Sequence, residues 1–260
     1  MKKIVCYIYI ICVCAVAFRV SAQTERPKGI EKSILLGLEY ELNAGLNIGG
    51  ASPIPLPAEI RKINGYAPRL NLQLGGQVTK WIDPQKKWGV SVGLRFETKG
   101  MEPKATVKNY GMEIYQDGKV LSGKWTGKVK TKYHTQQLVI PILAAYNISP
   151  RWKVSLGPYL AYAFSNDFDG HVYDGYLREG DPTGNKVSFS GDSRATYDFG
   201  DDLRKFQWGF QGGASWKAFN RFSVNANLTW GCNDIFNKSF KTVTFNMYPI
   251  YLNIGFGYLF

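Results

Sequence analysis

The chain has few of the side chains that most catalytic and metal sites need. It contains 4 cysteines, and Cys6, Cys12 and Cys14 lie close to the N-terminus. Cys232 is therefore the only cysteine in the rest of the chain. A single thiol has no second cysteine with which to form an internal disulfide or a cysteine-based zinc site. Only 2 histidines are present, so a histidine-dependent hydrolase or protease has few candidate residues.

Long apolar runs are also scarce. The run Ile4–Phe18 follows a pair of lysines and precedes the small residues Val20-Ser21-Ala22. It is shorter than the roughly 20 apolar residues that a membrane-spanning helix needs. Its flanks are typical of an export signal. We expect residues 1–22 to be a cleaved signal peptide and residues 23–32 to be a periplasmic N-terminal segment.

Positive charge exceeds negative charge, with a formal net charge of +12. A basic balance of this size can indicate nucleic-acid binding. An exported chain, however, meets anionic lipid headgroups and not nucleic acid. We therefore expect outer-membrane lipid and lipopolysaccharide as partners, and no nucleic acid.

The last stretch of the chain, 246–260, alternates apolar residues with small or polar ones, which predicts a strand with one apolar face. A terminal strand that ends on an aromatic residue resembles the C-terminal signal of bacterial outer-membrane β-barrels. The resemblance implies recognition by the barrel-assembly machinery. Three aromatic residues would form this assembly signal: Phe256, Tyr258 and Phe260.

The same alternation recurs along the chain, and short turns and longer loops follow each other in strict order between the alternating segments. This pattern predicts an all-β fold over 33–260, an eight-stranded antiparallel transmembrane β-barrel of the outer membrane with long extracellular loops and both termini in the periplasm. Apolar faces would meet lipid, and polar faces would line the interior. The expected strands are 33–48, 66–81, 88–97, 136–147, 152–164, 205–216, 222–232 and 246–260.

The longer loops differ in composition. Residues 49–64 contain three prolines and cannot continue a strand ladder. Residues 101–131 are rich in lysine and contain an Asp117-Gly118 turn, which predicts a hairpin beyond the membrane. Residues 165–203 are acidic and form the longest expected loop. Because the basic and acidic loops flank the same two strands, we expect them either to pack together or to contact other envelope proteins.

Three short motifs resemble those of a known family. They are QQLVIPILAAY at 136–146, the GPYLAYAF of the fifth expected strand, and WGCNDI at 230–235. They resemble the PorT-like outer-membrane β-barrel family common in Bacteroidetes, over nearly all of the chain after the signal. The motifs mark strand ends and turns and carry no catalytic group. PorT itself belongs to a secretion apparatus, but the resemblance does not select that branch.

Charged residues should fill the interior. A barrel of eight strands is about wide enough for its own side chains, which argues against an open pore. We expect a cross-strand ion-pair network that fixes the strand register, with Glu39 or Glu41 close to Arg69 or Arg95. By parity, seven charged residues point inward: Glu39, Glu41, Arg69, Arg95, Glu97, Lys153 and Lys205.

Catalytic and metal chemistry have one weak candidate region. His134 has no adjacent serine, whereas His171 lies near Asp167, Asp169 and Asp174. These acids are oxygen donors for calcium, but the stretch lacks the third acidic position and the terminal glutamate of an EF-hand. We expect no enzyme, no cofactor and no metal site, although whether 165–203 binds a metal ion stays open.

The expected function is that of a structural or interaction component of the cell envelope. An accessory role in a secretion or surface complex fits the same pattern. The alternatives are a surface-facing lipid-modifying or proteolytic barrel enzyme, and a narrow channel.

Overall fold

The computed structural model describes residues 37–260 except 117 and 192. The expected signal peptide 1–22 and the segment 23–32 lie outside the described residues. Contacts within the chain group Glu39–Phe260 into one compact unit, which is the unit described below. Among the described residues, no helix is long and apolar enough to cross a membrane.

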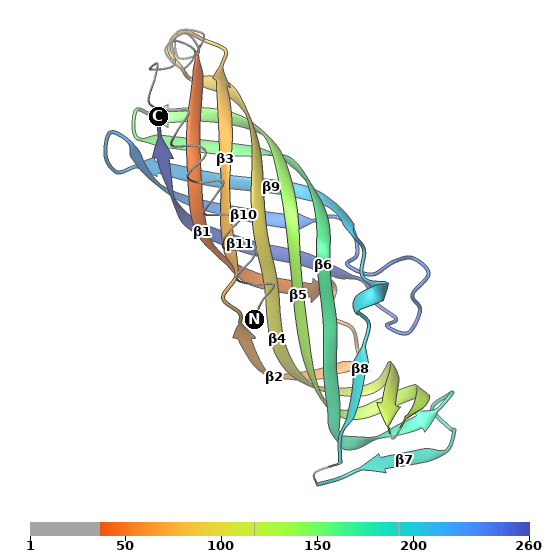
Figure 1. Cartoon of the computed structure of the whole chain (residues 1–260). Helices are drawn as coiled ribbons and strands as arrows, with labels where there is room; N and C mark the ends of the chain where they lie inside the picture. Colours follow the sequence, from red (N-terminus) through yellow and green to blue (C-terminus); the bar gives the residue numbers. More distant parts are fainter. Residues whose placement is uncertain (1–36, 117, 192) are drawn as a thin grey trace, which may run out of the picture. The chain divides into compact units, whose positions relative to one another are not determined.

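The unit is an antiparallel sheet of eleven strands (Figure 1). One short 3-10 helix, η1 (Gly200–Asp202), follows the eighth strand. The strands are β1 Leu38–Pro53, β2 Ile60–Pro68, β3 Leu72–Trp81, β4 Trp88–Gln116, β5 Lys119–Ser149, β6 Trp152–Glu179, β7 Lys186–Phe189, β8 Ala195–Asp198, β9 Phe206–Lys217, β10 Phe222–Gly231 and β11 Met247–Leu259.

The order of pairing closes on itself. It runs β4-β3-β1-β11-β10-β9-β6-β5, and β5 pairs in turn with β4. The first and last of these strands in the sequence, β1 and β11, pair antiparallel from Glu41↔Leu259 to Pro53↔Met247. The closed path leaves its strands without a free edge for most of their length.

The two faces of this sheet have opposite chemistry. In β1, Leu42 and Ile48 are 54% and 48% exposed, whereas Glu41 and Asn47 are buried. The same alternation continues around the pairing path, with exposed leucines, phenylalanines and tryptophans on one face. In a water-soluble protein the apolar face would be the buried one. The expected assignment of apolar residues to the outer face and polar residues to the inner face therefore holds.

The expected loop 49–64 is partly strand, and the expected strand 66–81 is divided into two strands. β1 continues to Pro53, and β2 begins at Ile60 within the stretch expected to be a loop. β2 pairs with β4 from Ile60↔Val107 to Pro68↔Met101, while β3 pairs with β4 separately. Proline lacks the N–H that a ladder needs, so Pro68 marks the end of β2 and interrupts the expected strand 66–81.

The basic connection is the expected hairpin. β4 and β5 pair without a long interruption as far as Gln116↔Lys119, and Gly118 occupies the turn with a positive φ of 76°. Glycine adopts this conformation without a steric cost.

The acidic connection was wrongly expected to be one long loop. β6 continues to Glu179 along the extended edge of β5, and β7 and β8 pair with it (Figure 1). The free edge of β5 supplies a ladder for these residues, and charged side chains on such strands can point to solvent. The last connection, 233–245, remains without a regular strand apart from the bridge Leu203↔Phe236.

The extended parts of β4, β5 and β6 pack over an apolar core that continues to Ala51 of β1 and Met247 of β11, and we call its outer part the distal cluster. The Trp125 ring lies 5.4 Å from the Phe189 ring, centroid to centroid, and Trp125 is fully buried. The basic and acidic segments pair within this region, where Lys128 Nζ lies 3.0 Å from Asp174 Oδ2. The two segments were expected either to pack together or to contact other proteins, and in the structure they pack together. The distal cluster includes Met112, Ile114, Trp125, Val172, Leu177 and Phe189.

The β1–β11 closure depends on two facing glycines. Gly45 and Gly255 are register partners, and a Cβ on Gly255 would lie 2.3 Å from the Ala44 carbonyl oxygen. We predict that Gly255→Val lowers the free energy of unfolding by about 1–3 kcal/mol, because the strands must separate to accept the side chain. Urea unfolding in detergent micelles measures this. Ile254→Val on the outer face is the control, and equal effects of the two substitutions would contradict the argument.

The distal cluster should unfold separately from the closed part of the sheet. We predict that Trp125→Ala costs about 3–5 kcal/mol locally, because it removes a buried indole and leaves a cavity. Hydrogen exchange should become faster in β7, β8 and the outer part of β6, with β1 and β11 unchanged. Trp216→Ala, at an exposed tryptophan of β9, should leave the distal cluster protected. Loss of protection in all strands at once would show that the two regions are one cooperative unit.

Candidate functional site

The middle of the closed sheet holds a buried charged triplet on one face of β4. Arg95 Nε and Lys99 Nζ lie 3.3 Å and 3.2 Å from the two carboxylate oxygens of Glu97, and all three side chains are 1–3% exposed. Arg95 also donates a hydrogen bond to Gln211 of β9, on the other side of the pairing path. Lys99 Nζ lies 5.3 Å from the centre of the Tyr251 ring. The triplet therefore links β4 to β9 and β11 through the interior.

A second buried carboxylate connects four strands. Glu41 Oε1 accepts hydrogen bonds from Ser223 and Asn225 of β10, each at 2.9 Å. Its Oε2 accepts from Gln77 of β3 at 2.9 Å and from Lys153 of β6 at 3.2 Å. Because its oxygens have four donors, the charge of Glu41 is compensated despite its burial.

Between these groups little space remains. The cavity among Asn43, Gln73, Arg95, Lys153 and Asn227 measures ≈ 20 Å³. A single water occupies roughly 10–15 Å³ on this measure. Side chains therefore fill the middle of the closed sheet.

The interior ion pairs have partners other than the expected ones. Glu39 and Glu41 both form ion pairs with Lys153, at 3.4 Å and 3.2 Å. Among the described residues, neither acid forms an ion pair with Arg69 or Arg95, so that part of the expectation is wrong. The physical reason is that alternation determines the face on which a residue lies but not its position along the axis of the closed sheet, since the strands are tilted and staggered.

Two of the seven expected residues lie away from this network. Arg69 is between β2 and β3, and its guanidinium lies 2.7 Å from Glu102 of β4. That hydrogen-bonded pairing holds the pKa of the Glu102 carboxyl below its usual range. Lys205 is exposed, immediately before β9. Lys99 was missed because the expected strand ended earlier, although it continues the alternation of Arg95 and Glu97.

The histidine and acidic candidates do not converge on one site. His134 is opposite Asp167 in the β5–β6 ladder, and His171 is opposite Lys130. Burial lowers the pKa of both imidazoles. Asp174 is paired with Lys128, and within the described part of the chain no group of three or more His, Cys, Asp or Glu residues is placed to hold a metal ion.

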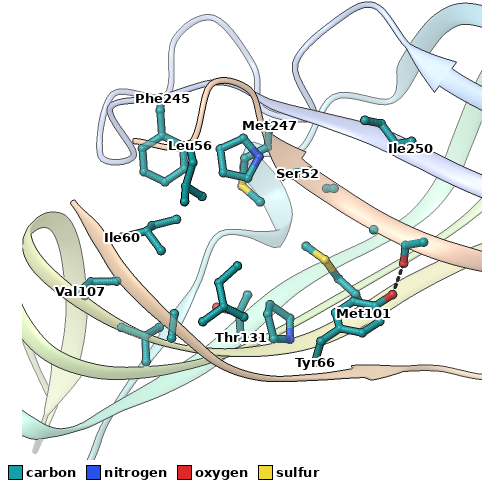
Figure 2. Close-up of a pocket in the computed structure, with 18 of the residues that line it drawn as sticks. Ser52, Leu56, Ile60, Tyr66, Met101, Val107, Thr131, Phe245, Met247 and Ile250 are labelled. Carbon is teal, nitrogen blue, oxygen red and sulfur yellow. Dashed lines mark hydrogen bonds between the residues drawn. The ribbon is translucent and has the colours of Figure 1, made fainter. Parts of the chain in front are cut away.

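A large apolar cavity that sequence reasoning missed lies between β1 and β2, which do not pair with each other. It measures ≈ 550 Å³ and collects side chains from β1, β2, β4, β5 and β11 (Figure 2). Leu56, Ile60, Met101 and Met247 point into the same space from different segments (Figure 2). The sequence signal for it was the apolar content of β2, whose residues were divided between a loop and a strand.

An interruption of the ladder creates this cavity. Asn47 N of β1 donates to the Asn71 carbonyl at 2.9 Å, close to the start of β3. Beyond that point β4 is paired by β2, while β1 is paired only by β11 among the described strands. Tyr66 of β2 reaches across and donates a hydrogen bond to the Gly49 carbonyl of β1 (Figure 2).

A closed antiparallel sheet with an apolar outer face and a filled polar interior defines the class of barrel proteins that are embedded in a membrane. The chain belongs to the family described as outer membrane protein beta-barrel domain, whose model matches residues 21–237. This membership assigns the protein to the outer membrane.

No curated protein matches the chain. Among solved structures, Ail of Yersinia pestis is similar with 11% identity and a TM-score of 0.33, covering 85% of this chain and 98% of Ail. OprG of Pseudomonas aeruginosa is similar with 15% identity and a TM-score of 0.37, covering 85% of this chain and 95% of OprG. Neisserial surface protein A is similar with 12% identity and a TM-score of 0.32, covering 86% of this chain and 97% of that protein.

The Glu41–Lys153 pair offers a test of the interior network. We predict that Glu41→Ala costs about 3–5 kcal/mol of unfolding free energy, because Lys153 keeps only the weaker, partly exposed Glu39. Glu39→Ala should cost no more than about 1 kcal/mol.

The double variant Glu41→Ala/Lys153→Met should be more stable than Glu41→Ala alone, since no buried charge is then left unpaired. Urea unfolding of the wild type, Glu41→Ala, Lys153→Met and the double variant gives the coupling free energy. Additive effects would mean that the two side chains stabilise the sheet independently.

Proposed function

We propose that the chain is an eight-stranded transmembrane barrel that acts as a structural or interaction component of the outer membrane. Its wall would consist of β1, β3, β4, β5, β6, β9, β10 and β11. The observation that carries the proposal is the filled interior, in which charged side chains leave a cavity of only ≈ 20 Å³. Such an interior favours a wall with surfaces for partners over a conducting pore.

The arrangement of connections supports a topology for this barrel. Short connections follow β3, β5 and β9 at one end of the sheet, whereas at the other end β4, β5 and β6 extend into the distal cluster. Outer-membrane barrels have short periplasmic turns and long extracellular loops. We therefore place both termini in the periplasm and the distal cluster outside the cell.

The proposal also covers how the barrel is assembled and which family it resembles. Phe256 and Phe260 are 69% and 55% exposed on β11 and after it, so with Tyr258 they are available as the signal for the assembly machinery. The motifs at 136–146 and 230–235 support membership of the PorT-like family. An accessory role in a secretion or surface complex fits a barrel with partner surfaces, although these motifs do not select it.

Partners would bind at the distal hairpin. Tyr115 and Val120 are register partners close to the turn, and both are exposed, at 44% and 55%. An exposed aromatic–aliphatic pair on a packed support is typical of a protein contact. Lipopolysaccharide and lipid would surround the wall below it.

We predict that a specific envelope protein co-purifies with the full-length chain after gentle detergent extraction, and that Tyr115→Ser/Val120→Ser abolishes its recovery. Quantitative mass spectrometry of the purified complexes measures this. Lys124→Ser in the same hairpin is the control and should retain the partner. Recovery of the same proteins with all three chains would exclude the hairpin as the binding surface. Stepwise ion currents in a planar bilayer would instead favour the narrow channel.

A further inference from the structure

The apolar cavity between β1 and β2 has the properties of a ligand site. Its volume of ≈ 550 Å³ lies within the roughly 300–1,000 Å³ of small-molecule sites. We propose that it binds a long-chain fatty acid, which enters sideways between β1 and β2 with its acyl chain inside and its carboxylate at the basic residues of β2. This inference goes beyond the structural role proposed above and does not depend on it.

Two of the four polar side chains in the lining already have partners within the protein. Tyr66 donates its hydroxyl hydrogen to the Gly49 carbonyl. The hydroxyl of Thr131 shares a 2.6 Å hydrogen bond with that of Tyr197. The other two are the hydroxyls of Ser52 and Tyr110, and the rest of the lining is apolar, which matches a hydrocarbon chain. Met101 and Met247 suit a flexible occupant because their unbranched side chains adapt their shape.

Two β-bulges give β2 its cavity face. Ile60, Ile63 and Tyr66 all line the cavity, although residues three apart point to opposite faces of a regular strand. The register of β2 against β4 shifts between Ile60 and Lys62 and again between Ile63 and Gly65. Each bulge adds a residue and reverses the alternation. An apolar row is thereby turned to the cavity.

The bulged strand also places cations beside the opening. Arg61 and Lys62 are exposed between the lining residues Ile60 and Ile63, and among the described residues neither forms an ion pair. A carboxylate at the cavity mouth would find these charges within the same strand. This charge complementarity favours an anionic amphiphile over a neutral hydrocarbon.

The cavity opens onto the outer apolar surface. Ile48, Leu56 and Ile63 belong to its lining and are each about half exposed. No ladder pairing joins β1 to β2 in the described chain. Moving the two strands apart would therefore break the Tyr66–Gly49 hydrogen bond but no hydrogen bonds of a strand ladder. A membrane-dissolved chain can therefore reach the cavity without passing through the interior.

Photolabelling tests the site. The full-length protein, in nanodiscs of zwitterionic phosphatidylcholine, is irradiated with a diazirine derivative of palmitic acid, and labelled peptides are identified by mass spectrometry. We expect labels in 101–107 and 247–250 that excess palmitic acid removes. Labels spread evenly over the outer faces of β9 and β10, without competition, would overturn the proposal and indicate ordinary lipid contact.

Two alanines provide a matched pair of variants. Ala105 lines the cavity, whereas Ala67, on the neighbouring β2, is exposed and does not. Ala105→Trp should reduce competed labelling by at least about tenfold, because the indole occupies the chain's space, and Ala67→Trp should leave it unchanged. If Ala105→Trp does not fold, Ile63→Trp at the exposed mouth replaces it. Wild-type labelling in a folded blocking variant would refute the site.

The carboxylate contact has its own readout. Arg61→Gln/Lys62→Gln should weaken competition by palmitic acid by about tenfold but leave competition by palmityl alcohol unchanged. Equal effects on both competitors, or none on either, would exclude recognition of the carboxylate at β2.

Discussion

Closure of the sheet by the β1–β11 ladder is the constraint on which the rest of the structure depends. In a hydrocarbon environment an unpaired backbone group costs several kcal/mol, so a sheet is stable there only without a free edge. Gly45 and Gly255 allow the closing strands to approach, and the pairing then extends to Pro53 and Met247. Once the path is closed, each strand must turn one face outward and one inward, which explains the opposite chemistry of the two faces.

A closed path of this size also determines what the interior can contain. Side chains that point inward meet those of opposite strands, and charged ones must be paired there because burial of an isolated charge is costly. Glu41 receives donors from β3, β6 and β10, whereas Glu97 is paired with Arg95 and Lys99 of its own strand. A shift of one strand by a residue would remove the contacts of Glu41 and place apolar residues inside. The network thus specifies register at the same time as it fills the interior.

The face on which each residue lies could be predicted from the sequence. The positions of residues along the axis of the sheet, and the irregular parts of the strands, could not. Alternation alone assigned Glu41, Arg95 and Glu97 correctly to the inner face. It could not show that Glu41 meets Lys153 instead of Arg95, since stagger along the axis is a property of the closed sheet. It also failed in β2, where bulges reverse the alternation, and in 165–203, where an acidic stretch gains a ladder only because β5 extends beside it.

The apolar cavity occurs where the ladder is interrupted, and this follows from the same constraint. Where β1 continues beyond its pairing with β3, its exposed backbone needs a substitute partner, which Tyr66 provides for Gly49. The space between β1 and β2 borders the apolar outer face, so mostly apolar side chains line it. The filled interior and the cavity are therefore distinct environments: charge pairing stabilises the first, and access from the lipid side determines what the second can bind.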